Sequence, residues 1–137
     1  MGSTNYTDTF IQVAEDCPVV AAEVPAARGG TPTVAGLQHA LLAEHPYELT
    51  SDDLLFAVHA QRQGVPDDAR DAERTAFFSR SQACLRASPL GKRHGWGLHH
   101  DAEGRVALVA VESERYRELA ADPGVRQVRA MRSRRAD

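Results

Sequence analysis

The chain has 137 residues, of which 42% are hydrophobic and 26% charged, with a formal net charge of −3. That length and balance suit one globular domain with its own core, and they exclude disorder over the whole chain. The longest uninterrupted apolar run, Val106 to Val111, is far shorter than the roughly 20 residues of a membrane-spanning helix, so no membrane partner is predicted.

The charge is unevenly distributed along the chain. Residues 1–83 hold five arginines and twelve acidic residues, whereas residues 84–137 hold eleven basic and seven acidic residues. Five arginines crowd the C-terminus: Arg126, Arg129, Arg132, Arg134 and Arg135. They are interpreted as a solvated tail that pairs with the acidic part or, alternatively, as a contact for a phosphate-bearing partner. Nucleic acid is not expected, because no aromatic residues interleave with these arginines.

The N-terminus and the cysteines favour the cytoplasm. The first ten residues contain neither a basic segment nor an apolar stretch, so no secretory signal is recognised. Cys17 and Cys84 are too few for a disulfide framework and are expected to be reduced.

The first half of the chain predicts one strand and three helices. Hydrophobic periodicity places these elements at residues 9–14, 31–45, 50–63 and 69–80. Thr31-Pro32 is taken as the start of the first helix, Thr50 caps the second and Gly64 ends it. The third helix is expected to bury four residues: Ala69, Ala72, Ala76 and Phe77. Residues 16–32 read as a long irregular segment, a feature that is often functional or mobile.

The second half is predicted to be rich in strands. They lie at residues 84–87, 95–100, 105–111 and about 125–131, with a short helix after Ser113. Residues 101–104 form a hairpin loop, and Val106–Val111 is apolar on both faces, as expected for a central strand. The order β-ααα-β-β-β-α-β predicts a single α+β domain over residues 1–137. Its helices pack on a mostly antiparallel sheet.

Several motifs together resemble a known family. They are Thr4-Asn5-Tyr6 with Thr9-Phe10-Ile11, Glu15-Asp16-Cys17-Pro18, Pro46-Tyr47 with Thr50-Ser51-Asp52-Asp53, the run Cys84-x-Arg86-Ala87-Ser88-Pro89-Leu90-x-Lys92-Arg93-x-Gly95-Trp96-Gly97, and Met131-Arg132-Ser133. The chain is similar to a family of small microbial single-domain proteins catalogued only as a domain of unknown function. The resemblance implies one domain and a cytosolic context, but no reaction. Gly91 and His94 depart from the family pattern, which weakens any mechanism that requires His94.

The segment 84–97 is the densest cluster of functional side chains and the predicted binding site. In a strand over 84–88, alternate side chains share one face, and the cations after Pro89 and Gly91 then lie on a loop. The candidate ligand-binding residues are Cys84, Arg86, Ser88, Lys92, Arg93, His94 and Trp96. Arginine and lysine side chains at this spacing could hold a phosphate or a carboxylate. The alternative interpretation is purely structural: Arg86 and Arg93 pair with acidic helices.

Trp96 stands between two glycines, Gly95 and Gly97, and is predicted to be a largely buried anchor of the sheet. The bare face opposite the indole would admit either a neighbouring backbone or a flat ligand.

Two other classes of function remain open. One is a small enzyme that uses Cys84 with a histidine, or Arg86 and His94 as acid–base groups. The other is a structural interaction protein, with a homodimer as the expected assembly. No cofactor and no metal are predicted, because no histidines are spaced as a helical i, i+4 zinc pair and neither a CxxC nor an HxH motif occurs. The sequence therefore favours binding of an anionic small molecule or of a protein partner.

Overall fold

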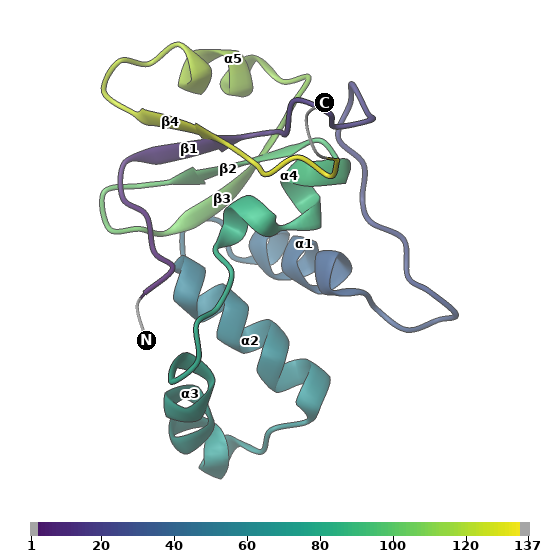
Figure 1. Cartoon of the computed structure of the whole chain (residues 1–137), viewed down its shortest axis with the longest axis vertical. Coiled ribbons are helices and arrows are strands. Elements are labelled where there is room, and N and C mark those ends of the chain that lie inside the picture. The colour runs from purple at the N-terminus through teal and green to yellow at the C-terminus, as the bar shows by residue number, and fades with distance from the viewer. Residues whose placement is uncertain (1–2, 135–137) are drawn as a thin grey trace.

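A computed structural model describes residues 3–134 of the protein (Figure 1). Its elements, in chain order, are β1 (Thr9–Gln12), α1 (Val34–Glu44), α2 (Ser51–Gln63), α3 (Arg70–Phe78), α4 (Pro89–Arg93), β2 (Trp96–His100), β3 (Val106–Ala110), α5 (Glu114–Ala120) and β4 (Arg126–Arg129). The strands form one sheet in the order β3-β2-β1-β4, in which only the β1–β4 pair is parallel. The predicted α+β class with a mostly antiparallel sheet is confirmed.

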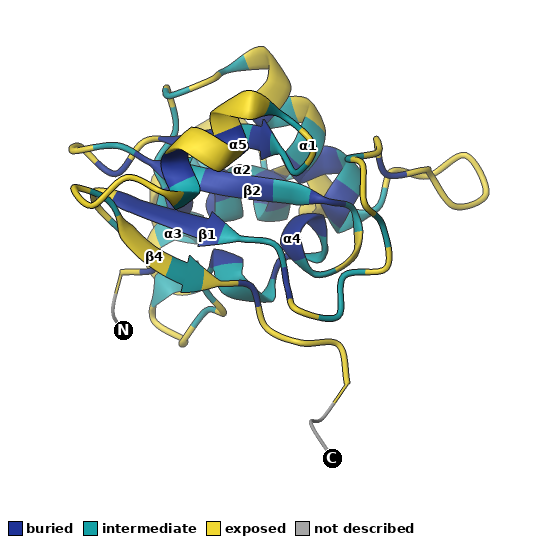
Figure 2. Cartoon of the chain, turned by 90° about the horizontal axis from the view of Figure 1, so that it is seen from above, coloured by how far each residue is buried: buried dark blue, intermediate teal, exposed yellow. Residues whose placement is uncertain are grey.

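Helices cover both faces of the sheet. Alternation along the strands turns Phe10 and Val109 toward Tyr116 and Leu119 of α5. The opposite face, which includes Ile11, belongs to the larger core formed with α1, α2 and α4. Figure 2 shows β1 and β2 buried between these layers, while β4 and the outer side of α5 are exposed.

The two long helices begin at threonines. Thr33 Oγ1 accepts a hydrogen bond from the Gly36 amide at 3.1 Å, so α1 begins later than the predicted start at Thr31-Pro32. Thr50 caps α2 as predicted, and Gly64 ends it in the left-handed conformation with φ of 63°. Local capping chemistry thus sets the position of both helices that lie beneath the sheet.

The predicted third helix is divided and not buried. Residues Asp67–Ala69 form a 3₁₀ turn before α3, and α3 buries no residue. Ala72 and Ala76 are exposed and Phe77 is half-buried, so the predicted buried face was wrong. The reason is position, since α3 packs on α2 at the end of the molecule distant from the sheet (Figure 1).

β3 is an edge strand and not the predicted central strand. It is apolar on both faces because α1 contacts one face and α5 the other. The chain before α2 covers the beginning of its outer edge: the Val106 amide donates to Leu49 O at 2.9 Å, and the Tyr47 amide donates to Val106 O at 3.0 Å.

The predicted strand at residues 84–87 is also wrong. Leu85–Ala87 is a 3₁₀ turn, and Ser88 caps α4 by accepting a hydrogen bond from the Leu90 amide at 3.1 Å. Pro89 occupies the first helical position, where its missing N–H costs nothing, so it starts a helix here and does not merely break a strand. Cys84, Arg86 and Ser88 therefore do not share a strand face.

No helix within residues 3–134 combines the length and the apolar character needed to cross a bilayer.

Candidate functional site

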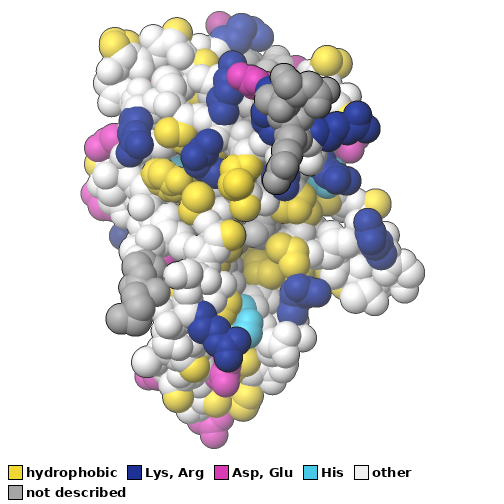
Figure 3. Space-filling view, in the orientation of Figure 1, with side chains coloured by type: hydrophobic (Ala, Val, Ile, Leu, Met, Phe, Trp, Pro, Cys, Tyr) yellow, Lys and Arg dark blue, Asp and Glu magenta, His cyan; other side chains and the backbone are white. Residues whose placement is uncertain are grey.

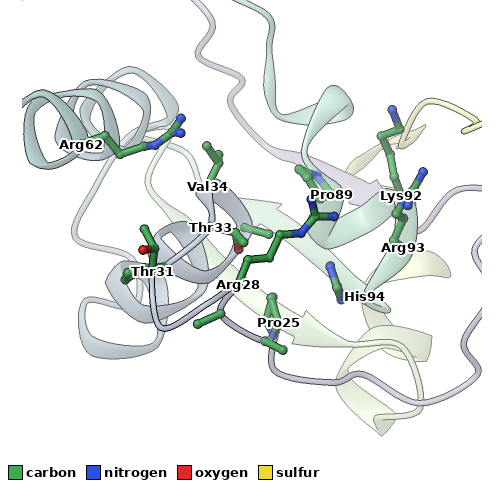
Figure 4. A pocket seen from close by; sticks show the side chains of 14 residues that line it. Pro25, Arg28, Thr31, Thr33, Val34, Arg62, Pro89, Lys92, Arg93 and His94 are labelled. Atoms are coloured by element: carbon green, nitrogen blue, oxygen red, sulfur yellow. The ribbon is translucent and has the colours of Figure 1, made fainter.

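A pocket of about 820 Å³ lies where the irregular segment, α1, α2 and α4 meet (Figure 4). We call it the basic pocket. It is lined by Pro25–Arg28, Thr31–Ala35, Arg62, Pro89 and Lys92–His94. Its volume falls within the range of small-molecule sites. The end of α4 supplies the part of this site that the sequence predicted.

The lining carries four permanent cations and no carboxylate: Arg28, Arg62, Lys92 and Arg93. None of the four lies within 4 Å of a carboxylate of residues 3–134. In Figure 4, Arg62 lies on one side, Lys92 and Arg93 lie on the other, and Arg28 lies between them. Like charges that converge without a counter-charge raise the local potential, so the pocket attracts anions. Figure 3 shows several basic side chains over the sheet and α4.

The beginning of α1 adds two backbone donors to the pocket. Val34 and Ala35 line it, and their amides precede the first intrahelical hydrogen bond, which the Leu37 amide makes to Thr33 O at 2.9 Å. No partner for these two amides is found among residues 3–134. The first turn of α1 contains no acidic residue. Free amides and the positive end of the helix dipole both favour a bound anion.

His94 closes the pocket on the side of the sheet. Its Nδ1 is buried and lies 3.4 Å from Glu23 Oε1, but the angles do not make a hydrogen bond. Glu23 is held in place by its backbone, because its amide donates to His94 O at 3.0 Å and its carbonyl accepts from Trp96 Nε1 at 2.8 Å. Burial, reinforced by the charge of His94, lowers the pKa of the neighbouring His39.

Trp96 is half-buried and packs against the main core, in line with its predicted role as an anchor of the sheet. Its ring packs against His39 with centroids 5.1 Å apart. The bare face at its flanking glycines is filled by the protein itself. A Cβ at Gly97 would lie 2.7 Å from the Phe10 ring, and one at Gly95 would lie 3.0 Å from Ala22 Cα. These glycines therefore permit close internal packing and leave no slot for a flat ligand there.

Arg86 and Ser88 have structural partners and do not line the basic pocket. Arg86 Nε donates to Arg129 O at 2.7 Å, and Arg86 O accepts from the Met131 amide at 2.8 Å. Arg86 thus fastens the chain after β4, whereas the structural interpretation of the sequence had paired it with acidic helices. Ser88 is only 4% exposed, and its hydroxyl donates to Gln38 Oε1 at 2.6 Å.

Cys84 lies in a separate environment. The Tyr6 hydroxyl donates to its Sγ at 3.2 Å, and burial followed by this contact raises the pKa of Tyr6 to about 12. The ring of His100 packs edge-on against Tyr6, with centroids 5.3 Å apart. No histidine nitrogen of residues 3–134 contacts Sγ, so the pairing that a thiol enzyme needs is not assembled. Cys84 and Cys17 are both free.

The adjacent histidines of β2 point to opposite faces, as the sequence indicated. His99 Nδ1 is 2.7 Å from the Tyr47 hydroxyl, and burial lowers the pKa of His99. His100 is fully buried, and burial lowers its pKa to about 4. The nearby backbone of Leu98 and Thr9 offsets part of that shift. Within residues 3–134, no three His, Cys, Asp or Glu side chains gather as a metal site would require.

Sequence reasoning missed Arg28, Arg62 and the start of α1 as parts of the site. The irregular segment 16–32 was recognised as unusual, and Arg28 is its only basic residue. That was a usable signal. For Arg62 there was no such signal in the sequence, because nothing in the spacing of residues 28, 62 and 93 indicates that they line one pocket.

The profile of one protein family, described as a family of unknown function (DUF6157), matches residues 1–136. The chain belongs to this family. No curated protein and no solved structure matches the chain significantly. Membership of DUF6157 confirms the resemblance seen in the sequence and assigns no activity, so function must be argued from the basic pocket.

Proposed function

We propose that this member of DUF6157 binds a small anionic molecule, with phosphate or carboxylate chemistry, in the basic pocket. The observation that carries the proposal is a pocket lined by four cations and no carboxylate, where none of the four pairs with a carboxylate of residues 3–134. At the start of α2, by contrast, the protein places its own carboxylate beside a cation, where Asp53 lies 3.0 Å from Arg74.

The chemistry of the donors favours an oxyanion. Arginine presents paired N–H donors that match two oxygens of a phosphate or carboxylate, and Lys92 adds a point charge. The amides of Val34 and Ala35 lie in the first turn of α1 and have no partner among residues 3–134, and free amides of this kind are used in many phosphate sites. Lining by both kinds of donor supports recognition of a group with several oxygens.

A thermal-shift titration with sodium phosphate tests the proposal. The protein is titrated at constant ionic strength, balanced with sodium chloride, so that general screening does not change. Phosphate should raise the melting temperature of the wild type in a saturable manner, because a ligand bound only to the folded state stabilises it by about 2.7 kcal/mol at 100 times Kd.

The variant Arg93→Ala should fold normally, because Arg93 is exposed, and should lose most of the phosphate effect. Arg80→Ala is the matched control, since Arg80 is an exposed arginine that does not line the pocket. A wild type that does not respond to phosphate up to millimolar concentrations would refute the proposal.

A further inference from the structure

A second, smaller cavity opens beside the basic pocket. It has a volume of about 240 Å³, lies between α1, α2 and α3, and shares Val34 and Arg62 with the basic pocket. We call it the side pocket. A molecule held by its anionic group in the basic pocket can therefore extend past Arg62 into the side pocket.

The side pocket has apolar walls and one aromatic stack. Val34, Leu55, Val58 and Phe77 line it. The His59 ring lies against Phe77 with centroids 4.6 Å apart and planes inclined by 35°. Walls of this kind suit a flat ring, because a planar group can pack its face against apolar and aromatic side chains.

Fixed amide groups accompany these walls. Gln38 is only 3% exposed and lines the side pocket, and its Oε1 is occupied by the Ser88 hydroxyl. Its amide nitrogen makes no hydrogen bond to a group of residues 3–134 and retains some accessible surface. Gln82 Nε2 donates to Phe77 O at 2.7 Å, which leaves the Gln82 side-chain oxygen as an acceptor. The site thus offers a donor and an acceptor, held by hydrogen bonds to other groups.

The chemistry of the occupant follows from these groups. An alkyl chain would leave the Gln38 amide buried and unsatisfied, which is unfavourable. A planar heterocycle with ring nitrogens and exocyclic oxygens or amines would satisfy both amides while it packs on the apolar walls. Linked through a sugar to one or more phosphates, a ring of this kind is the base of a nucleotide.

We infer that the ligand is a nucleoside phosphate, whose phosphates occupy the basic pocket and whose base occupies the side pocket. This inference rests on the proposed function, because it requires the basic pocket to bind the phosphates. Arg62 lies at the junction of the two pockets and contacts the part of the ligand that joins base and phosphate.

Isothermal titration calorimetry in magnesium-free buffer tests the inference with inorganic pyrophosphate and the four common nucleoside 5′-diphosphates. At least one diphosphate should bind tenfold or more tightly than pyrophosphate. Gln38→Met should abolish that advantage and leave pyrophosphate affinity unchanged, since methionine keeps the volume and removes the amide. Gln61→Met is the matched control, because it makes the same exchange at an exposed position of α2 that lines neither pocket.

The outcomes separate the two proposals. If pyrophosphate binds and no nucleoside diphosphate binds more than twofold better, the nucleotide inference is wrong and the anion pocket stands. If no phosphate compound binds, both are wrong. Should Gln38→Met fail to fold, His59→Ala provides the same test, because it removes one wall of the side pocket at a partly exposed position. A nucleotide advantage that survives this variant would also overturn the inference.

Discussion

The two long helices start with the same residue type and differ in what completes their first turn. At α2, Thr50 and Asp53 form a reciprocal capping box. Asp52 also accepts hydrogen bonds from the Thr4 amide at 2.8 Å and the Thr4 hydroxyl at 2.6 Å. At α1, the residue equivalent to Asp53 is Gly36, and the first turn contains no acid. The protein closes one helix end with its own carboxylates and leaves the other without one.

The surroundings of the two helix ends have opposite electrostatics. Burial alone would raise the pKa values of Asp52 and Asp53, but hydrogen bonds and Arg74 outweigh it, so both lie below their usual value. The N-terminal end of α1 faces four cations, none of which pairs with a carboxylate of residues 3–134. A shared capping residue therefore does not decide whether the start of a helix is structural or available for binding. The third residue of the helix does.

The largest expected effect is a loss of stability in acid on the α2 side of the molecule, where the ring of His100 packs on that of Tyr6. A folded pKa of about 4, against 6.5 for an ordinary histidine, means that the unfolded chain binds the proton first. The stability that depends on a neutral His100 is present above pH 6.5 and is lost as the pH falls toward 4, by about 3 kcal/mol in total.

Urea denaturation at pH 7, 5.5 and 4 checks this prediction. His100→Leu should be at least as stable as the wild type at pH 7, since both ring nitrogens lack a partner among residues 3–134, and it should lose less stability on acidification. Parallel pH profiles for the two proteins would contradict the prediction.

The next effect measures how much the hydrogen bonds at the start of α2 contribute to stability. Asp52→Ala removes the acceptor for Thr4 and for the Ser3 hydroxyl, which donates to Asp52 at 2.8 Å. We expect a loss of roughly 1–2 kcal/mol in the free energy of unfolding, because these are hydrogen bonds to a charged but partly solvated group. Phosphate affinity should not change. Asp68→Ala, at an exposed position in the 3₁₀ turn, is the control and should change the free energy by less than about 0.5 kcal/mol.

A smaller effect follows from giving α1 the carboxylate that α2 has. Gly36→Asp should stabilise the ligand-free protein by about 0.5–1 kcal/mol, since it rebuilds the capping box and places a negative charge near the cations. It should also weaken phosphate binding. A Cβ at residue 36 would lie 3.3 Å from Thr33 Oγ1, so there is room after a small adjustment. Gly36→Ala separates helix propensity from charge and should retain phosphate binding. Equal phosphate affinities for the Asp and Ala variants would contradict the claim that the missing carboxylate leaves the start of α1 available to an anion.

The smallest predicted change is in the stability of Arg93→Ala. Because Arg93 is exposed and pairs with no carboxylate of residues 3–134, its removal should alter the free energy of unfolding by less than about 0.5 kcal/mol in the absence of phosphate. Denaturant titration without phosphate measures this value. A loss above 1 kcal/mol would mean that Arg93 is structural.

Local chemistry made parts of the fold predictable. Thr50, Gly64 and the hairpin at residues 101–104 carry their own signals, and each was placed correctly. Pro89 was misread because proline both ends strands and starts helices, and only the neighbouring Ser88 cap distinguishes the two. The burial of α3 could not be predicted, since it depends on how far α2 projects from the sheet.

The candidate site was predictable only where it is contiguous in sequence. Lys92, Arg93 and His94 follow one another and were recognised, and they do line the basic pocket. Arg28 and Arg62 join them through tertiary packing that no spacing rule describes. Arg86 was included because a predicted strand would have placed it on one face with Cys84 and Ser88, and that alignment was lost with the strand.

The most direct test of the account compares the two helix ends in one NMR experiment. Phosphate is titrated into ¹⁵N-labelled protein at constant ionic strength, and the amide signals of Val34 and Ala35 are followed beside those of Ser51 and Asp52. The account predicts saturable shifts at the start of α1, with no matching shifts at the start of α2, where Asp52 and Asp53 already lie. Shifts of equal size at both ends, or none at Val34 and Ala35, would contradict it.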